Sequence, residues 1–224
     1  MRVRRPVVLI ASLLLLARAT AAQSTTLVAP TSTAAIPAGF GNTAFLTFEY
    51  GVRAGFGSFS TVAGADAVNG WPTGYGQLAS AFWSNGINAS AASLDVVQIL
   101  ATAVVPANVV TLNSLDMGEW SRLGENLSIR IYNLSGTELF RQSKPGSDLV
   151  GAIVRPTVTF TPNVSAVGGL YLQFGEDTWY TGASNIRYTV SSPSSSVVPE
   201  PSTYALMTVG LGALAIGARR RRRV

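Results

Sequence analysis

The stretch LSIRIYNLSG, at residues 127–136, decides the fold class of this 224-residue chain. Its first part alternates apolar and polar residues, so that Leu127, Ile129 and Ile131 face one side of an extended strand. The last four residues, 133–136, begin with Asn and end with Gly, which is typical of a turn between antiparallel strands. The stretch therefore predicts a strand followed by a β-hairpin.

The same two-residue period, or a similar strand-like composition, recurs along the chain. The segments are 46–50, 94–100, 109–115, 137–141, 157–161, 170–174 and 186–190. Glycines that mark turns separate them, among them Gly118 and Gly182. No segment after residue 90 has a helical period, and residues 77–83 could form one or two helical turns.

Eight or so short strands predict an all-β fold. We expect a single antiparallel β-sandwich over residues 23–190, made of two packed sheets. A domain of about 170 residues can bury a sufficient hydrophobic core without disulfide bonds.

The composition excludes several classes of catalytic site. The chain contains no Cys and no His. It therefore cannot use a Ser–His–Asp triad, a thiol nucleophile or a zinc site built from Cys and His. We expect no metal and no cofactor, and leave calcium, which binds carboxylate oxygens, as the alternative.

The net charge of +5 comes from the two ends of the chain. Nine of the 16 basic residues lie within residues 2–18 and 219–223. Residues 23–198 carry seven basic and ten acidic residues, a net charge of −3. A nucleic-acid binder needs clustered basic residues on its folded part, so we expect no nucleic-acid partner.

Residues 1–22 have the three parts of a secretory signal peptide. A basic start is followed by the apolar run 6–17 and by a short exit of small residues. We expect cleavage to leave Ala22 or Gln23 as the first residue. The alternative is an uncleaved anchor helix, for which the apolar run is short.

The C-terminal part has the features of a membrane anchor. Residues 191–198 form a Ser/Pro linker, and residues 202–218 contain no charged side chain. In a helix these 17 residues would extend about 25 Å, against a hydrocarbon core of about 30 Å. Five arginines then predict a stop to transfer and a cytoplasmic end: Arg219, Arg220, Arg221, Arg222 and Arg223.

Residues 199–224 resemble the PEP-CTERM protein-sorting signal. The resemblance rests on Pro199-Glu200-Pro201, the short apolar segment rich in Gly and Ala, and the arginine cluster. This signal occurs on exported proteins of Gram-negative bacteria that also make exopolysaccharide. It implies processing by an exosortase, a membrane-embedded enzyme expected to cut near Pro-Glu-Pro and discard the helix and arginines. Pro199, Glu200 and Pro201 would be the recognition elements, and the inner membrane a transient partner.

Residues 109–190 have a second resemblance. Segments 111–116, 128–132, 169–175 and 184–188 resemble the ectodomain common among PEP-CTERM proteins, a jelly-roll-like sandwich akin to galactose-binding-like and carbohydrate-binding modules. Such domains often end in Asp-Asn-Ile. Because Ser184 stands here in place of the Asp, no role is transferred to that position.

Aromatic side chains beside polar loop groups suit carbohydrate stacking. Trp179 and Tyr180, next to Glu176 and Asp177, form the preferred ligand-binding cluster, and the same acidic loop is the place for calcium. Residues 71–75 (WPTGY) and Trp120 are the other aromatic candidates.

We expect no catalytic residues and no enzymatic activity. Paired carboxylates can hydrolyse glycosides, and the candidates are Glu176 with Asp177, Asp116 with Glu119, and Glu125. Solvated loop carboxylates are the simpler interpretation. The sequence predicts an exported surface or extracellular-matrix protein that is structural or binds exopolysaccharide. The alternatives are a secreted, carboxylate-dependent glycan-active enzyme and a permanently membrane-anchored surface protein.

Overall fold

The computed structural model describes residues 21–57, 68–84, 95–120, 126–145, 157–175 and 180–193. These ranges contain β-strands and no helix, which confirms the predicted all-β class. The strands are β1 (Gln23–Leu27), β2 (Leu46–Ala54), β3 (Asn69–Trp71), β4 (Ala81–Trp83), β5 (Asp95–Ala103), β6 (Val109–Glu119), β7 (Asn126–Asn133), β8 (Glu138–Pro145), β9 (Val158–Phe160), β10 (Val164–Val167), β11 (Gly169–Gly175) and β12 (Thr181–Ser191).

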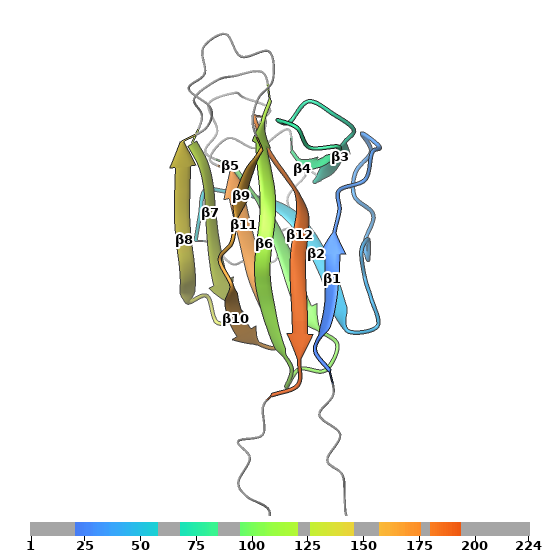
Figure 1. Cartoon of the computed structure of the whole chain (residues 1–224), viewed down its shortest axis with the longest axis vertical. Helices are drawn as coiled ribbons and strands as arrows, with labels where there is room; N and C mark the ends of the chain where they lie inside the picture. The colour runs from blue at the N-terminus through green and yellow to red at the C-terminus, as the bar shows by residue number, and fades with distance from the viewer. Residues whose placement is uncertain are drawn as a thin grey trace, which may run out of the picture.

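The strands form two antiparallel sheets that lie face to face (Figure 1). The seven-stranded sheet has the order β10-β6-β12-β4-β3, with β1 paired to β12 and β9 paired to β6. The five-stranded sheet has the order β2-β5-β11-β7-β8. This arrangement agrees with the predicted sandwich.

The main core lies between the two sheets and is built by the alternation read from the sequence. Leu127, Ile129 and Ile131 are each at most 1% exposed, and they pack with residues from both sheets. Across the interface, the rings of Phe48 and Tyr188 lie 5.4 Å apart. Burial of such side chains contributes roughly 1.5–3 kcal/mol each to folding.

The predicted hairpin after β7 is confirmed. The Gly136 amide donates to the Asn133 carbonyl at 3.0 Å, and β7 and β8 pair in antiparallel register. The Asn133 side-chain oxygen also accepts hydrogen bonds from the amides of Ser135 and Thr137, at 3.1 and 2.8 Å. The turn is thus held by its own asparagine, as is common for Asn in turns.

Two glycines predicted to mark turns lie inside strands instead. Gly118 in β6 and Gly182 in β12 are direct cross-strand partners. A Cβ on Gly118 would lie 2.6 Å from the Tyr75 carbonyl carbon, and one on Gly182 would lie 2.8 Å from the Tyr75 ring. The glycines are therefore explained by the close approach of another segment, a known use of glycine in strands.

The helical turns considered for residues 77–83 are not formed. Residues 81–83 are strand β4, and the segment before it is a turn in which the Leu78 amide donates to the Tyr75 carbonyl at 3.0 Å. Strand β4 faces two apolar clusters at once, since Phe82 packs in the main core while Ala81 and Trp83 pack on the outer face of the sheet.

The registers define two ends of the sandwich. Gln23 pairs with Val190, Val109 pairs with both Ser191 and Val167, and Leu170 pairs with Asn133. We call this the tail end, because both ends of the described chain lie there, at the bottom of Figure 1. The far end, at the top, carries the beginning of β5 and the end of β6.

Within the described residues, no helix is long and apolar enough to cross a membrane. The predicted anchor segment 202–218 and residues 1–20 of the predicted signal peptide lie outside the described residues.

Candidate functional site: an aromatic pocket at the far end

The preferred sequence candidates lie mostly outside the described residues. Glu176, Asp177 and Trp179 are among those outside, and so are Pro199, Glu200 and Pro201 of the sorting motif and Arg219–Arg223. Tyr180 is described and is partly exposed. Its carbonyl accepts a hydrogen bond from the Trp120 amide at 2.7 Å, so it sits beside the second aromatic candidate.

Four aromatic side chains line an open pocket of about 200 Å³ on the outer face of the seven-stranded sheet. They are Trp71 at the end of β3, Tyr75 in the turn that follows, Trp83 at the end of β4, and Trp120 directly after β6. The structure thus joins the two secondary candidates, residues 71–75 and Trp120, into one site.

The rings meet at steep angles and form the walls of the pocket. Trp71 lies 5.1 Å from Trp83 at an interplanar angle of 80°, and 5.0 Å from Trp120 at 84°. Tyr75 lies 5.4 Å from Trp120 at 43°. Edge-to-face contacts of this kind are favourable for aromatic pairs. Tyr75 and Trp83 are buried, whereas Trp71 and Trp120 are half-buried and present ring surface to solvent.

Close backbone packing fixes the segment that carries Tyr75. The paired glycines Gly118 and Gly182 let Tyr75 lie directly on the sheet. Gly74 has φ = +101°, a conformation that side chains with a Cβ rarely adopt, and a Cβ there would lie 2.7 Å from the Trp120 ring. The Gly76 amide donates to the Glu119 carbonyl at 2.9 Å, which ties the segment to the end of β6.

The pocket also has a fixed base. The Trp83 indole Nε1 donates to the Gly70 carbonyl at 3.0 Å, across the β3–β4 pair. Leu78 and Ala81 complete the small apolar cluster beneath the rings. We call Trp71, Tyr75, Leu78, Ala81, Trp83 and Trp120 the aromatic cluster.

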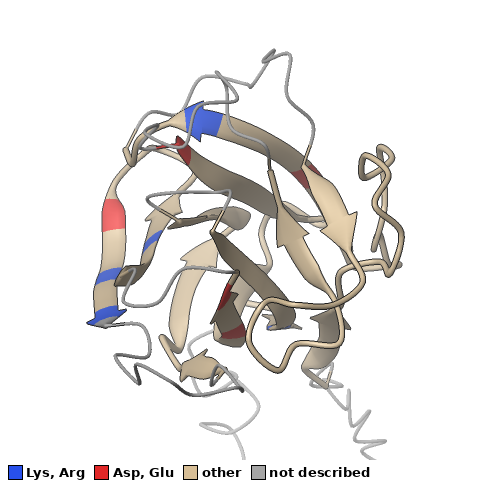
Figure 2. Ribbon diagram, turned by 90° about the horizontal axis from the view of Figure 1, so that it is seen from above, with Lys and Arg blue, Asp and Glu red and all other residues tan. Residues whose placement is uncertain are grey.

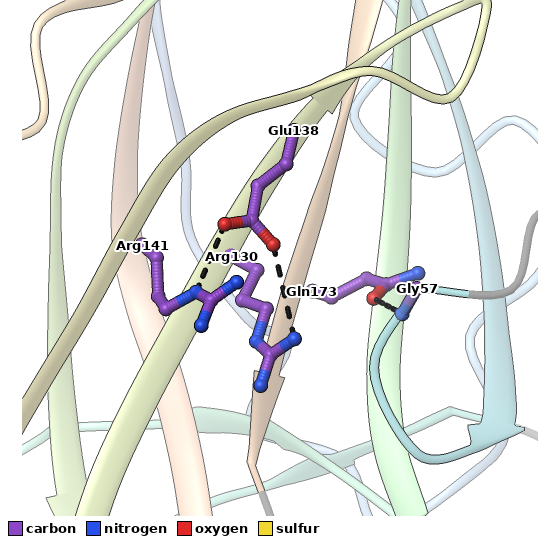
Figure 3. Close-up of polar contacts among 5 residues, drawn as sticks. All are labelled: Gly57, Arg130, Glu138, Arg141 and Gln173. Carbon is purple, nitrogen blue, oxygen red and sulfur yellow. Dashed lines mark hydrogen bonds and ion pairs between the residues drawn. The ribbon is translucent and has the colours of Figure 1, made fainter.

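A second group of polar side chains covers the outer face of the five-stranded sheet (Figure 3). Glu138 accepts from Arg141 Nε at 2.9 Å and lies 3.8 Å from Arg130 Nη1. The Glu138 carboxylate raises the pKa of Arg141, through a hydrogen bond and through its charge. Because one carboxylate lies between two guanidinium groups on neighbouring strands, the arrangement joins β7 to β8 and resembles a structural contact more than a ligand site.

The same face holds a buried amide pair. The Gln173 amide donates to Gln98 at 2.8 Å, and its oxygen accepts from the Gly57 amide at 2.9 Å (Figure 3). Phe56 lies under Arg130, with the guanidinium carbon 4.6 Å from the ring centre. Segment 55–57 therefore lies over part of this outer face.

Two of the carboxylates considered for catalysis, Asp116 and Glu119, lie within the described residues. The two oxygens of Asp116 accept from Thr159 at 2.7 Å and from Asn185 at 2.9 Å, next to the irregularity that Asn185 makes in β12. Glu119 is buried at the end of β6. Ser184, which replaces the Asp of the resembled ectodomain, accepts from the Ala29 amide at 3.2 Å and binds β12 to the chain after β1.

Within the described ranges, no group of three or more Asp and Glu residues lies close enough to hold a metal ion. The acidic loop at Glu176 and Asp177, named for calcium, is outside these ranges, so calcium binding there stays a prediction.

Sequence reasoning missed Trp83, because it placed this residue in a helical turn. The signal that could have found it is local: the triplets NGW (69–71) and AFW (81–83) both end in Trp and are separated by a glycine-containing turn region. In the observed register Asn69 lies opposite Trp83 and Trp71 opposite Ala81, so the two tryptophans share one face of the strand pair.

Comparison with known proteins gives a family match at the C-terminal end and weak structural likenesses. No curated protein matches the chain. The solved structure of the arabinose-bound MgGH51 α-L-arabinofuranosidase covers 74% of this chain at 12% identity, with a TM-score of 0.38. The chain spans 26% of that protein, and a likeness this low carries no argument about fold or activity.

The model of the PEP-CTERM protein-sorting motif matches residues 197–223, which confirms the resemblance found in the sequence. The motif implies export, membrane anchoring by the C-terminal segment before sorting, and processing by an exosortase. The chain therefore carries a PEP-CTERM sorting motif that follows a β-sandwich in the sequence, and the motif implies an exported protein sorted by an exosortase.

Proposed function

We propose that this protein is a polysaccharide-binding protein of the cell surface or extracellular matrix, and that the aromatic pocket is its sugar site. The observation that carries the proposal is the open pocket whose half-exposed walls are Trp71 and Trp120. Aromatic ring faces stack on the apolar faces of sugar rings, and binding pockets combine such surfaces with a few polar groups.

The size of the pocket limits what it can hold. Its volume of about 200 Å³ lies below the roughly 300–1,000 Å³ of sites that enclose a drug-sized ligand. It suits a single sugar residue, such as a chain end or a side branch, better than a long stretch of polymer. The turn region that carries Tyr75 also holds two exposed polar residues, Thr73 and Gln77.

The binding test compares two tryptophan variants with a surface control. The secreted form is titrated with exopolysaccharide fragments, and binding is followed by intrinsic tryptophan fluorescence. Trp71→Ala and Trp120→Ala should each weaken binding by roughly 30-fold, equivalent to about 2 kcal/mol, as expected for a central aromatic contact. The control Leu139→Ala changes an exposed residue of β8 on the other sheet and should bind normally. Equal affinity in all three variants would refute the pocket as the sugar site.

We propose binding without cleavage. The hydrogen bonds that Asp116 already accepts from Thr159 and Asn185 support this, because a carboxylate held in this way is suited to a structural role. Incubation of the protein with exopolysaccharide should leave the polymer intact. Release of oligosaccharides, detected by mass spectrometry, would favour the glycan-active enzyme instead.

The sorting route we propose runs through the inner membrane of a Gram-negative bacterium, with the anchor removed before release. The matched motif at residues 197–223 supports it. Glu200→Ala should leave the uncut precursor in the membrane, while the neighbouring variant Ser202→Ala should be processed. Normal processing of the Glu200 variant, seen by intact mass, would favour the permanently anchored alternative.

A further inference from the structure

The tail end of the sandwich carries no charged residue in any of its described loops. Lys, Arg, Asp and Glu are all absent from the residues that form it: 21–26, 40–46, 102–110, 133–137, 161–169 and 189–193. Glu138 directly follows the loop 133–137 in the sequence, and its carboxylate is paired with Arg141. At the far end, by contrast, Arg53, Asp95 and Glu119 lie at the ends of their strands; Figure 2 looks onto this end.

Aliphatic side chains project from this uncharged surface. Val104, Val105, Leu134 and Val167 are 51%, 53%, 45% and 65% exposed. Among the described residues, only Val28 and Leu139 are comparably exposed large hydrophobic residues elsewhere. We call the four side chains the aliphatic rim. Scattered exposed hydrophobic residues are ordinary, but a group gathered on one surface indicates an interaction site.

The loops that carry the rim form one connected platform. The Ala103 amide donates to the Gly168 carbonyl at 2.8 Å, and the Gly168 amide donates to the Asn108 carbonyl at 2.8 Å. Leu134 lies against this junction, since a Cβ on Gly168 would be 3.3 Å from its Cδ1. The rim is thus held in place before any partner arrives, which lowers the entropic cost of binding.

The position of the anchor identifies the partner. Strand β12 ends at Ser191, on the tail end, and the sorting motif begins at residue 197. Ser202, the first residue of the apolar segment, follows Ser191 by 11 residue steps, which extend at most about 40 Å; a flexible coil of this length averages roughly 20 Å. While the anchor is in the membrane, the rim therefore remains close to the lipid surface.

We propose that the tail end docks on the bilayer from which the anchor emerges, with the aliphatic rim inserted at the boundary between headgroups and acyl chains. A lipid surface fits the chemistry, because valine and leucine gain from leaving water and no charged loop must be desolvated. The tether also supplies this partner at a high effective concentration in every copy of the chain. Docking would orient the sandwich upright, with the aromatic pocket directed away from the membrane.

The test uses the full chain in vesicles of phosphatidylcholine and phosphatidylglycerol. Because the natural chain has no cysteine, a single one can carry an environment-sensitive dye. Val105→Cys places the dye on the rim, and Ala54→Cys places it at an exposed position of the far end. Lipids with a nitroxide near the headgroup should quench the dye at position 105 at least about fivefold more than the dye at position 54, since such quenching needs close contact with the lipid.

Charged substitutions on the aliphatic rim provide a second test of docking. Val104→Asp with Val167→Asp should reduce the quenching of a dye at Leu134→Cys to the level seen at the far end, with an unchanged melting temperature because both sites are exposed. Persistent quenching in this variant would overturn the proposal. So would equal quenching at positions 105 and 54, or a change at position 105 that depends on protein concentration and not on lipid, which would indicate a second copy as the partner.

The proposal rests on the anchoring step of the proposed function, and the two can fail separately. Flotation of the chain with the vesicles reports the anchor, whereas quenching reports docking. A chain that does not float refutes both. A chain that floats but shows no preferential quenching refutes docking alone, and neither result bears on the sugar pocket.

Discussion

The main core and the aromatic cluster are both apolar, but they are built in different ways. The main core joins the two sheets through residues such as Leu112 and Ile131, which are fully buried. The aromatic cluster lies on the outer face of one sheet, and two of its rings remain half-exposed. Large half-exposed rings contribute less to stability than they would inside. Their position at the surface supports the proposed binding role.

The two clusters also differ in how they satisfy polar atoms. The Trp83 indole N–H in the aromatic cluster has a carbonyl partner, whereas the Tyr188 hydroxyl in the main core has no hydrogen-bond partner among the described residues. Burial correspondingly raises the pKa of Tyr188 above its ordinary value. The main core therefore contains a buried hydroxyl without a described partner, whereas the indole N–H of the aromatic cluster is hydrogen-bonded.

The largest effect should come from the main core. Leu112→Ala removes a fully buried side chain from β6 and should lower the free energy of unfolding by about 2–5 kcal/mol, since a cavity remains. Urea unfolding followed by circular dichroism measures this loss. The control Val167→Ala, at an exposed site, should change it by less than about 0.5 kcal/mol. Similar values for both would remove the distinction between core and surface.

The next largest loss of stability should come from the contact between the aromatic cluster and the seven-stranded sheet. Gly118→Ala places a Cβ 2.6 Å from the Tyr75 carbonyl carbon, so the Tyr75 segment must move. We expect a loss of about 1–3 kcal/mol, as for overpacking, together with weaker sugar binding. Ser114→Ala, on the same strand, is the matched control and should affect neither. If Gly118→Ala were as stable as the control, Tyr75 would not be packed on the sheet as described.

The Tyr188 hydroxyl leads us to expect a substitution that does not destabilise the protein. Tyr188→Phe removes a buried hydroxyl without a described partner and should raise the free energy of unfolding by about 1 kcal/mol or leave it unchanged. Thermal melting at neutral pH provides the measurement. A clear loss of stability would show that the hydroxyl is satisfied after all.

A small destabilising effect should come from the base of the pocket. Trp83→Phe keeps an aromatic ring but removes the donor to the Gly70 carbonyl, at a cost of about 1 kcal/mol. Because Trp83 is buried beneath the half-exposed walls, sugar binding should fall much less than in Trp120→Ala. Titration of both variants under the same conditions compares them, and an equal loss would mean that Trp83 contacts the ligand directly.

The parts of the fold that depend on local pattern could be predicted from the sequence. Alternation in residues 127–131 gave the inward face of β7, and residues 133–136 gave the hairpin, because both signals lie within one strand or turn. Gly118 and Gly182 misled for a physical reason. A glycine that makes room for another segment looks, in sequence, like one that turns the chain.

The site was only partly predictable. Trp71 and Trp120 were recognised as candidates, yet nothing in the sequence shows that residues almost 50 positions apart share one pocket. That contact depends on the pairing of β4 with β12 and of β12 with β6, which no local pattern specifies. The aliphatic rim was missed for the same reason, since its loops meet only in the folded sandwich.

The position of β12 has a consequence for secretion. This strand pairs with β6 along one edge and with β1 and β4 along the other, so the seven-stranded sheet is incomplete without it. It is also the last described strand to be synthesised. During export β1 and the edges of β4 and β6 that face β12 therefore stay unpaired until residues 181–191 have left the translocation channel. Completion of the sheet and arrival of the anchor at the membrane then become nearly simultaneous events.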